Sequence, residues 1–266
     1  MSRSSLRDLF LTGLAVVLLA AVVGGGWFVI RARAAGGGAT IEPAPVSPLP
    51  TPSPSDTASP KPPERQQWTV ARTLGPVTVY EQPSRVARVR ATLAAHARYG
   101  GDTVLLVRRV TEVGGDFWYD VWLPLPPNGS HGWVSARGLA LYQVYSELVI
   151  DRQRRTLQVV RDGAAVATFR VAVGTADLPT PAGFFFVMEK VRPSEPNGAY
   201  GVLAIGISAF QPKLSYWAGG GQVAIHGTNM PGLIGRAVSH GCVRMTNHDI
   251  LAVSRLVRIG SPVIIR

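Results

Sequence analysis

Cysteine is nearly absent from this chain of 266 residues, which contains a single one, Cys242. One cysteine excludes an internal disulfide, so cysteine content does not report the redox compartment. Acidic residues are also scarce, with 16 Asp and Glu against 27 Lys and Arg, and the formal net charge is +11. A basic surface suits a polyanion or an anionic cell wall, although ordinary solubility charge explains it equally well. Because no basic stripe is interleaved with aromatic residues, we expect no nucleic-acid partner.

Charge is absent from residues 9–30, where the sequence is apolar throughout. At about 1.5 Å per residue, a helix of this length reaches roughly 33 Å, enough to cross a bilayer. Arginines flank both ends, so charge leaves the orientation open. A cleaved signal peptide is the alternative, because Ala32-Arg33-Ala34 is a small-x-small site. The run is long for a signal peptide, so we expect residues 1–35 to form a transmembrane helix that anchors an exported, wall-facing chain.

Residues 36–67 contain nine prolines and almost no large apolar residues. Such a segment cannot bury a hydrophobic core, so we interpret it as an extended, disordered linker. Its length would let a domain reach from a membrane towards a cell wall, or it is a passive tether.

Residues 68–143 show short β segments separated by turns. The expected strands lie at 77–80, 104–110, 117–123 and 131–134. Residues 85–98 are interpreted as a short helix or a long loop. The order Val-Tyr, Trp-Tyr-Asp-Val and Gly-Trp-Val resembles bacterial SH3-like domains, which implies a small β-barrel. His131 lies in the last hairpin, where we expect a structural role.

The sequence pattern of residues 144–266 predicts a mainly β domain. The expected strands are short alternating segments at residues 146–151, 156–160, 165–173, 184–188, 222–226 and 262–265. Thr246-Asn247 is a helix cap, so one clear helix should follow at 248–257. Residues 190–222 are rich in Gly, Pro, Ser and aromatic residues, and we interpret them as a long lid or binding loop. Tyr200 and Trp217 in this loop are candidates to cover a substrate, or else they pack the loop.

Residues 223–250 contain the only cysteine and three of the five histidines, His226, His240 and His248. A thiol beside imidazoles is the minimum set for nucleophilic catalysis, because the thiolate attacks and a histidine accepts and returns the proton. Gly241 leaves the backbone free to approach a substrate and to point N–H groups at a developing oxyanion. We therefore predict that Cys242 is a nucleophile; a buried, inert thiol is the alternative.

Three motifs in this stretch resemble those of L,D-transpeptidases of the YkuD type: Ile-His-Gly-Thr-Asn at 225–229, Ile-Gly at 234–235 and Ser-His-Gly-Cys-Val-Arg-Met at 239–245. The resemblance covers roughly residues 145–266 and includes Pro-Thr-Pro-Ala-Gly at 179–183. It implies a β-sandwich catalytic domain and a cysteine acyltransferase that acts on peptidoglycan stem peptides. It also implies that no cofactor or metal is needed and that carbapenems acylate the cysteine.

The resemblance implies that Cys242 attacks the carbonyl of the third residue of a tetrapeptide stem, a diamino acid. D-alanine then leaves, and an acceptor amine takes the acyl group, which cross-links the cell wall. His226 resembles the family's proton acceptor and donor, with the carbonyl of Gly227 or Thr228 orienting its ring. His240 is expected to tune the thiolate or to support the loop.

Arg244 offers a planar guanidinium that suits a substrate carboxylate, although a structural salt bridge is the alternative. The other predicted substrate-binding residues are Ser239, Gly227, Thr228, Asn229, Tyr200 and Trp217. His248, at a helix start, is expected to have no catalytic role.

Three alternatives remain open. One Cys and three His could bind zinc, but only one residue separates His240 from Cys242, whereas two to four residues usually separate the members of a structural zinc pair. A cysteine carboxypeptidase or endopeptidase would use the same site with water as the acceptor. A non-catalytic wall-binding protein would use the SH3-like module beside a degenerate transferase domain, and the intact His226, His240 and Cys242 argue against it.

Overall fold

The computed structural model describes residues 65–217 and 219–266, and residues 60–266 form one compact unit. The predicted anchor, and residues 36–64 of the predicted linker, lie outside the described residues. Among the described residues, no helix has the length and apolar character needed to span a membrane.

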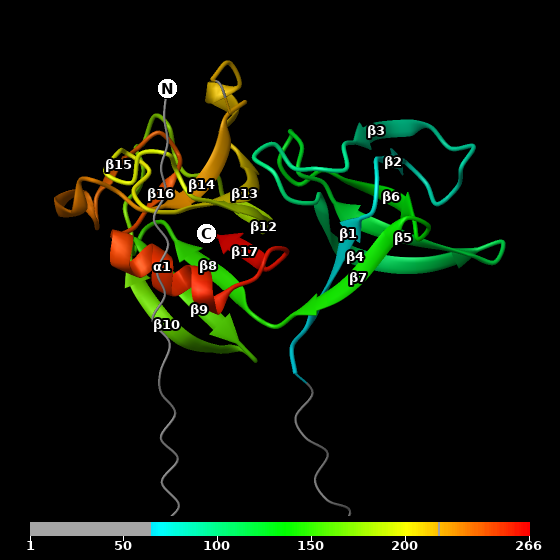
Figure 1. Cartoon of the computed structure of the whole chain (residues 1–266), viewed down its shortest axis with the longest axis horizontal. Helices are drawn as coiled ribbons and strands as arrows, with labels where there is room; N and C mark the ends of the chain where they lie inside the picture. Colours follow the sequence, from blue (N-terminus) through cyan, green and yellow to red (C-terminus); the bar gives the residue numbers. More distant parts are fainter. Residues whose placement is uncertain (1–64, 218) are drawn as a thin grey trace, which may run out of the picture. The chain divides into compact units, whose positions relative to one another are not determined.

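The first sheet contains seven antiparallel strands in the order β3-β2-β6-β5-β4-β1-β7 (Figure 1). In chain order these are β1 (Trp68–Thr73), β2 (Val77–Tyr80), β3 (Val89–Leu93), β4 (Val104–Val113), β5 (Asp116–Trp122), β6 (His131–Ser135) and β7 (Leu139–Val144). Apolar residues alternate with polar ones along these strands, so one face buries a core that includes Val79, Leu105 and Val121. The order leaves β3 and β7 at opposite ends of the sheet, so the closed SH3-like barrel stays a prediction.

Strand β3 corrects the interpretation of residues 85–98 as a helix or loop. It pairs on one side only, with β2, where Val77 lies opposite Leu93. In β3 only Leu93 is buried, because an edge strand faces solvent along much of its length. The alternation that marks a half-buried strand is therefore missing from this part of the sequence.

The C-terminal domain contains an eight-stranded sheet in the order β10-β9-β8-β17-β12-β13-β14-β16 and a two-stranded sheet of β11 and β15. The strands are β8 (Glu147–Asp151), β9 (Thr156–Arg161), β10 (Ala164–Arg170), β11 (Val173–Gly174), β12 (Gly183–Val191), β13 (Ala204–Phe210), β14 (Gln222–His226), β15 (Ala237–Ser239), β16 (Val243–Arg244) and β17 (Pro262–Ile265). Its helices are α1 (Asn247–Leu256) and two 3-10 turns, η1 (Pro212–Leu214) and η2 (Pro231–Leu233). The mainly β fold class with one α-helix in the described residues is thus confirmed.

Strand β12 joins the two halves of the large sheet. Its residues 183–186 pair with β17, and its residues 187–191 pair with β13. Side chains from both halves and from α1 pack into one core, which includes Ile150, Ile205 and Ile250. The helix begins at the predicted cap, where the Thr246 hydroxyl accepts the Asp249 N–H at 3.1 Å. One shared core between two half-sheets fits the expected β-sandwich.

The structure corrects the interpretation of residues 190–222 as one long loop. Strand β13 and the turn η1 lie inside this range. Ile205 and Ile207 of β13 point into the core, while Gly206 between them has no side chain. The glycine and serine of this strand give it a loop-like composition, although its residues 205–209 are all buried, as in a strand covered on both faces.

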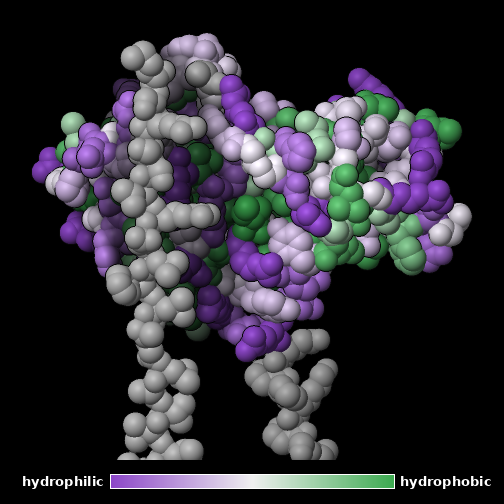
Figure 2. All heavy atoms as spheres, viewed as in Figure 1, coloured by the Kyte–Doolittle hydropathy of each residue, from purple (hydrophilic) through white to green (hydrophobic). Residues whose placement is uncertain are grey.

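The two sheets contact each other through an apolar cluster. Val70, Leu106 and Val144 from the first sheet pack with Phe186 of β12. The Asn128 side chain also bonds both backbone groups of Phe210, each at 2.8 Å. Elsewhere the first sheet exposes single apolar side chains such as Phe117, and Figure 2 shows hydrophobic atoms interspersed with hydrophilic ones over it. Scattered exposure of this kind does not mark a docking surface.

Candidate active site

Cys242 lies directly before β16, the last strand of the large sheet. Strand β16 pairs in parallel with β14, where Ile225 lies beside Val243 and His226 beside Arg244. On its other side, Arg244 exchanges two backbone hydrogen bonds with Ala172, at 2.8 and 2.9 Å. The backbone next to the thiol is therefore fixed from both sides.

The turn before Cys242 is held by Ser239, which is 1% exposed. The Ser239 hydroxyl donates to the Cys242 carbonyl and accepts the Gly241 N–H at 3.2 Å. Gly241 has a φ of 120°, a conformation that other residues rarely adopt. The Gly241 N–H, predicted to face an oxyanion, is thus engaged inside the turn, and Ser239 shapes the turn that presents the thiol.

His226 ends β14 and is 4% exposed. Its Nδ1 lies 2.6 Å from the Gly227 carbonyl oxygen, which can only accept, so Nδ1 carries the proton and Nε2 keeps a lone pair. Burial lowers the pKa of His226 to about 4, against the opposing effect of the Gly227 hydrogen bond. The ring is therefore neutral at physiological pH and able to accept a proton.

Cys242 is partly exposed as a residue, and its sulfur receives the backbone N–H of Ala224 at 3.4 Å. Burial raises the pKa of the thiol, although the Ala224 N–H and the Arg244 charge act in the opposite direction. Ala224 and His226 are two residues apart on one strand, so their side chains share a face. Val243 pairs with Ile225 and both lie in the hydrophobic core, so their neighbours Cys242 and His226 direct the neutral thiol and the neutral imidazole to the other side of the sheet.

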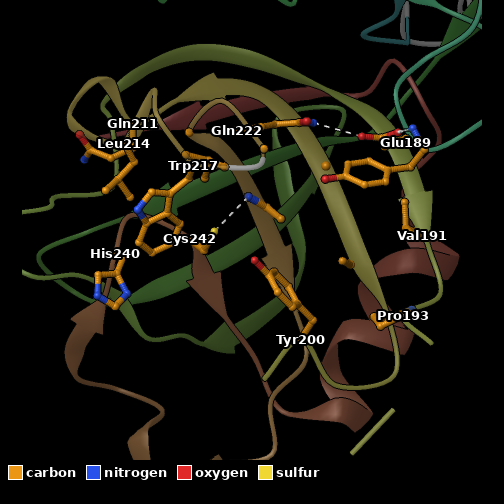
Figure 3. A pocket seen from close by; sticks show the side chains of 17 residues that line it. Glu189, Val191, Pro193, Tyr200, Gln211, Leu214, Trp217, Gln222, His240 and Cys242 are labelled. Carbon is orange, nitrogen blue, oxygen red and sulfur yellow. Dashed lines mark hydrogen bonds between the residues drawn. The ribbon is translucent and has the colours of Figure 1, made fainter. Parts of the chain in front are cut away.

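A pocket of about 380 Å³ opens beside Cys242. Of the predicted site residues, Tyr200, Trp217, His240 and Cys242 line it (Figure 3). The Tyr200 ring lies 4.7 Å from the His226 ring, and the Trp217 ring lies 5.3 Å from the His240 ring, centre to centre. One aromatic side chain from the 190–222 segment thus accompanies each predicted histidine.

Arg244 contacts the same region from β16. Beside the larger effect of burial, its charge lowers the pKa of both His226 and Cys242. Its Nε atom is buried without a hydrogen-bond partner. Arg244 is in none of the ion pairs among the described residues and does not line the pocket, so its predicted contact with a substrate carboxylate stays a prediction.

The remaining predicted substrate-binding residues lie outside the pocket lining. Thr228 is buried, its N–H bonds Asn247 at 3.1 Å and its hydroxyl accepts the Met230 N–H. Asn229 is exposed on the following turn. Gly227 contributes its carbonyl to His226, as one of the two predicted orienting groups. In this segment Gly227 contacts His226, and the predicted substrate-binding roles of Gly227, Thr228 and Asn229 stay predictions.

The sequence reasoning missed Asn247, which organises the backbone behind His226. Its Oδ1 accepts the N–H groups of Val202 and Thr228. A Cβ on Gly201 or Gly227 would lie 2.1 or 2.2 Å from this oxygen, so both positions require glycine. Asn247 was interpreted only as part of a helix cap, and its other partners are distant in sequence.

Three polar residues that line the pocket were also missed: Glu189, Gln211 and Gln222. Gln211 is buried, donates to the Pro179 carbonyl at 2.7 Å and lies against Gly241. Tyr99, from the loop between β3 and β4, lines the pocket as well, so the first sheet contributes to it. No local motif marks these residues, because strand pairing and loop docking bring them together. Among the described residues, no three His, Cys, Asp or Glu side chains are grouped to hold a metal ion.

Sequence comparisons with known proteins agree with the family that the motifs within residues 225–245 predict. The model of the YkuD L,D-transpeptidase catalytic domain matches residues 145–265. YkuD of Bacillus subtilis (strain 168) is 32% identical over 124 residues, which cover 47% of this chain and 68% of that protein. YkuD of Bacillus licheniformis is 35% identical over 44% of this chain and 62% of its own length. A crystal structure of an L,D-transpeptidase from Mycobacterium tuberculosis H37Rv is 18% identical, covers 73% of this chain and 80% of that chain, and has a TM-score of 0.40.

Proposed function

The chain belongs to the YkuD family of L,D-transpeptidases, and from this membership we propose that it is a peptidoglycan L,D-transpeptidase with Cys242 as its nucleophile. The observation that supports this proposal most strongly is the strand register around the thiol. It puts a partly exposed cysteine and a neutral, proton-accepting histidine on one face of the sheet, beside a pocket. These are the parts that acyl transfer through a thioester needs.

In the proposed mechanism, Cys242 attacks the carbonyl carbon of the third residue of a tetrapeptide stem. His226 Nε2 takes the thiol proton as the carbon–sulfur bond forms, because both groups are neutral at rest. The developing oxyanion is bound by backbone N–H groups near Cys242. The carbon–nitrogen bond to D-alanine then breaks, and the imidazolium returns its proton to the leaving amine.

An acceptor amine of another stem resolves the thioester in the second half of the reaction. The amine attacks as a neutral nucleophile, loses a proton to His226 and forms the new amide, while Cys242 leaves as the thiol. His240 and Trp217 form one side of the groove, and Tyr200 covers the His226 ring on the other. We assign His240 a part in shaping the groove, because its ring contacts the Trp217 ring in the pocket wall.

The test uses residues 60–266, the compact unit that contains both sheets. This fragment is incubated with a tetrapeptide donor and an amine acceptor, and the products are read by mass spectrometry. We expect release of D-alanine and a cross-linked product, with a thioester mass on Cys242 when the acceptor is left out. Cys242→Ala should keep the fold and form neither, and a carbapenem adduct that persists in this variant would contradict the assignment. Free tripeptide as the main product would instead indicate a carboxypeptidase, with water as the acceptor.

The proposed location is the outer face of the cell membrane. The uncharged run at residues 9–30 and the proline-rich segment that follows it support a single-pass anchor with the catalytic domain on the wall side. Protease added to cells without their outer barrier should release a soluble fragment that begins within residues 36–67. Complete protection of the chain would contradict this location.

A further inference from the structure

The pocket beside Cys242 contains a carboxylate that lacks a cationic partner. Glu189 is 4% exposed, and its two oxygens accept the Gln222 Nε2 at 3.1 Å and the Tyr99 N–H at 3.3 Å (Figure 3). None of the ion pairs among the described residues includes Glu189. Burying a carboxylate is costly unless it is paired. Its position in the wall of a pocket means that a ligand can supply the missing cation.

A β-bulge turns Glu189 towards the pocket. Val187 lies opposite Ile207, whereas Glu189 lies opposite Gly206, so one extra residue of β12 falls between these two pairs. Val187 and Ile207 both face the hydrophobic core. Without the bulge, a residue two positions after Val187 would face the core as well. The bulge reverses that alternation for Glu189.

Glu189 and Cys242 lie in one row across four strands. Gly206 pairs with Glu189 on one side and with Ala224 on the other. The parallel register of Ile225 with Val243 puts Ala224 beside Cys242, where its N–H contacts the sulfur. Gly206 and Ala224, between the carboxylate and the thiol, both line the pocket. Because Gly206 and Ala224 have no side chain or a small one, they leave space for a ligand between the carboxylate and the thiol.

Gly206 gives the Glu189 side chain its room. A Cβ on Gly206 would lie 2.9 Å from Glu189 Oε1 and 2.9 Å from Gln222 Nε2. The carboxylate therefore extends over β13 towards β14. Because neighbouring strands are about 4.8 Å apart, the carboxylate and the Cys242 sulfur are separated by roughly one to two strand spacings, about 5–10 Å.

The distance between the Glu189 carboxylate and the Cys242 sulfur determines which amine of the reaction can bind to Glu189. The acceptor amine must reach the thioester carbonyl itself, and it attacks as a neutral group, so Glu189 cannot hold it during attack. A diamino acid at the third position of the donor has a second amine at the end of its side chain. A stem of four carbons, as in lysine, places that amine roughly 6 Å from the attacked carbonyl. The donor's own side-chain ammonium fits the spacing.

We propose that Glu189 binds the side-chain ammonium of the donor's third residue and so selects donors in which this amine is free. The inference rests on the proposed function, because it specifies the substrate of the same site. Gln222 and the Tyr99 N–H are positioning groups that hold the carboxylate over Gly206. A donor whose amine is already acylated presents no cation and leaves the carboxylate unpaired in the bound state.

The test compares two donors in single-turnover thioester formation, followed by mass spectrometry of residues 60–266. One tetrapeptide has a diamino acid with a free side-chain amine at position three, and the other is the same peptide with that amine acetylated. We expect the wild-type protein to react about tenfold or more faster with the free amine, because a buried charge pair is lost with the acetylated donor. Equal rates for the two donors would overturn this proposal alone. A thioester with neither donor would overturn the proposed function and this inference with it.

Glu189→Gln removes the charge at nearly constant volume. It should slow the free-amine donor by about tenfold or more and change the acetylated donor by less than about twofold. Glu195→Gln is the matched control, since it removes the same charge from an exposed position and should keep the preference. If Glu189→Gln slows both donors equally, Glu189 only supports the fold and the proposal is wrong. If this variant does not fold, the wild-type comparison of the two donors decides.

Discussion

The first sheet and the C-terminal domain each bury a carboxylate, but they satisfy it in opposite ways. Asp120 of β5 is 0% exposed and is bound by Arg108 at 2.8 Å, Arg109 at 3.0 Å and His131 at 3.0 Å. Among the described residues, the side chain of Glu189 in β12 has an amide and a backbone N–H as its partners and no cation. Removing a carboxylate that the protein neutralises itself leaves its cations without a partner and destabilises the fold, whereas a carboxylate without a cation is available to a ligand.

The same contrast extends to histidine. His131 in the first sheet directs Nδ1 at a carboxylate and lies against the Trp122 ring. His226 in the C-terminal domain uses Nδ1 for the Gly227 carbonyl, which leaves Nε2 with a lone pair. Near the pocket, the Glu189 carboxylate has no cation within the described part of the chain, and His226 Nε2 keeps a free lone pair. At Asp120, by contrast, the carboxylate is already bound by Arg108, Arg109 and His131. Substitutions in the two regions should separate activity from stability.

The largest expected effect is the loss of the proton acceptor. His226→Ala should slow thioester formation by about 10²-fold or more, the range for removing acid–base catalysis. His240→Ala is the matched control and should cost less than about tenfold, because its ring lies in a tilted contact with Trp217 in the pocket wall. Single-turnover acylation measured against pH distinguishes the two. A nearly wild-type rate for His226→Ala with an inactive His240→Ala would reverse the assigned roles.

The next effect concerns stability in the first sheet. Asp120→Asn leaves Arg108 and Arg109 without their anion, and the free energy of unfolding should fall by about 2–4 kcal/mol. Asp116→Asn is the control, because its pair with Arg137 is largely exposed and should contribute about 0–1 kcal/mol. Urea denaturation measures both, and the rate of thioester formation should stay unchanged in the folded variants. A slower reaction without a loss of stability would mean that the Asp120 cluster belongs to the active site.

A smaller effect is expected on the pH dependence of stability. The pKa of His226 is lowered by burial from 6.5 to about 4. Between these values the unfolded chain binds a proton that the folded chain does not, so stability falls as the pH drops through this window. From pH 7.5 to 5.5 the loss from this group should be about 1 kcal/mol. His226→Gln should lack this loss, whereas His248→Gln, at an exposed ring, should keep it. Equal pH profiles for wild type and His226→Gln would contradict the buried, neutral state.

Elements with a strong local signal could be predicted from the sequence. Strands β14 and β17 have the expected bounds, 222–226 and 262–265, and α1 begins one residue before its expected start. Alternation of apolar residues fixes the strands, and the Thr246 cap fixes the helix start. Strands β3 and β13 were missed because one is an exposed edge and the other has a loop-like composition.

The residues of the candidate site also divide into those that a local sequence motif marks and those that only the fold brings together. Cys242, His226 and His240 stand in sequence motifs, so they could be named in advance, and their catalytic roles stay predictions. Glu189 could not be found, because its position depends on a bulge and on the register of four strands. Asn247 could not be found either, since its partners Val202 and Thr228 are far from it in sequence. Local sequence patterns therefore predict the candidate reacting groups, whereas the residues around them can be identified only once the pairing of distant segments is known.

The smallest expected effect is at the contact between the two regions. Asn128 follows β5, and its side chain donates to the Phe210 carbonyl and accepts the Phe210 N–H. Asn128→Ala removes both bonds at an exposed position where water can replace them, so the free energy of unfolding should fall by only about 0.5 kcal/mol. Asn128→Asp keeps the acceptor and loses the donor, and we expect it to lie between wild type and the alanine variant. Thioester formation with a small donor should change by less than about twofold, because Tyr99 still reaches the pocket through its bond to Glu189. A large loss of activity in Asn128→Ala, measured on folded protein, would show that the pocket depends on this contact and that the separation of stability from activity between the two regions is wrong.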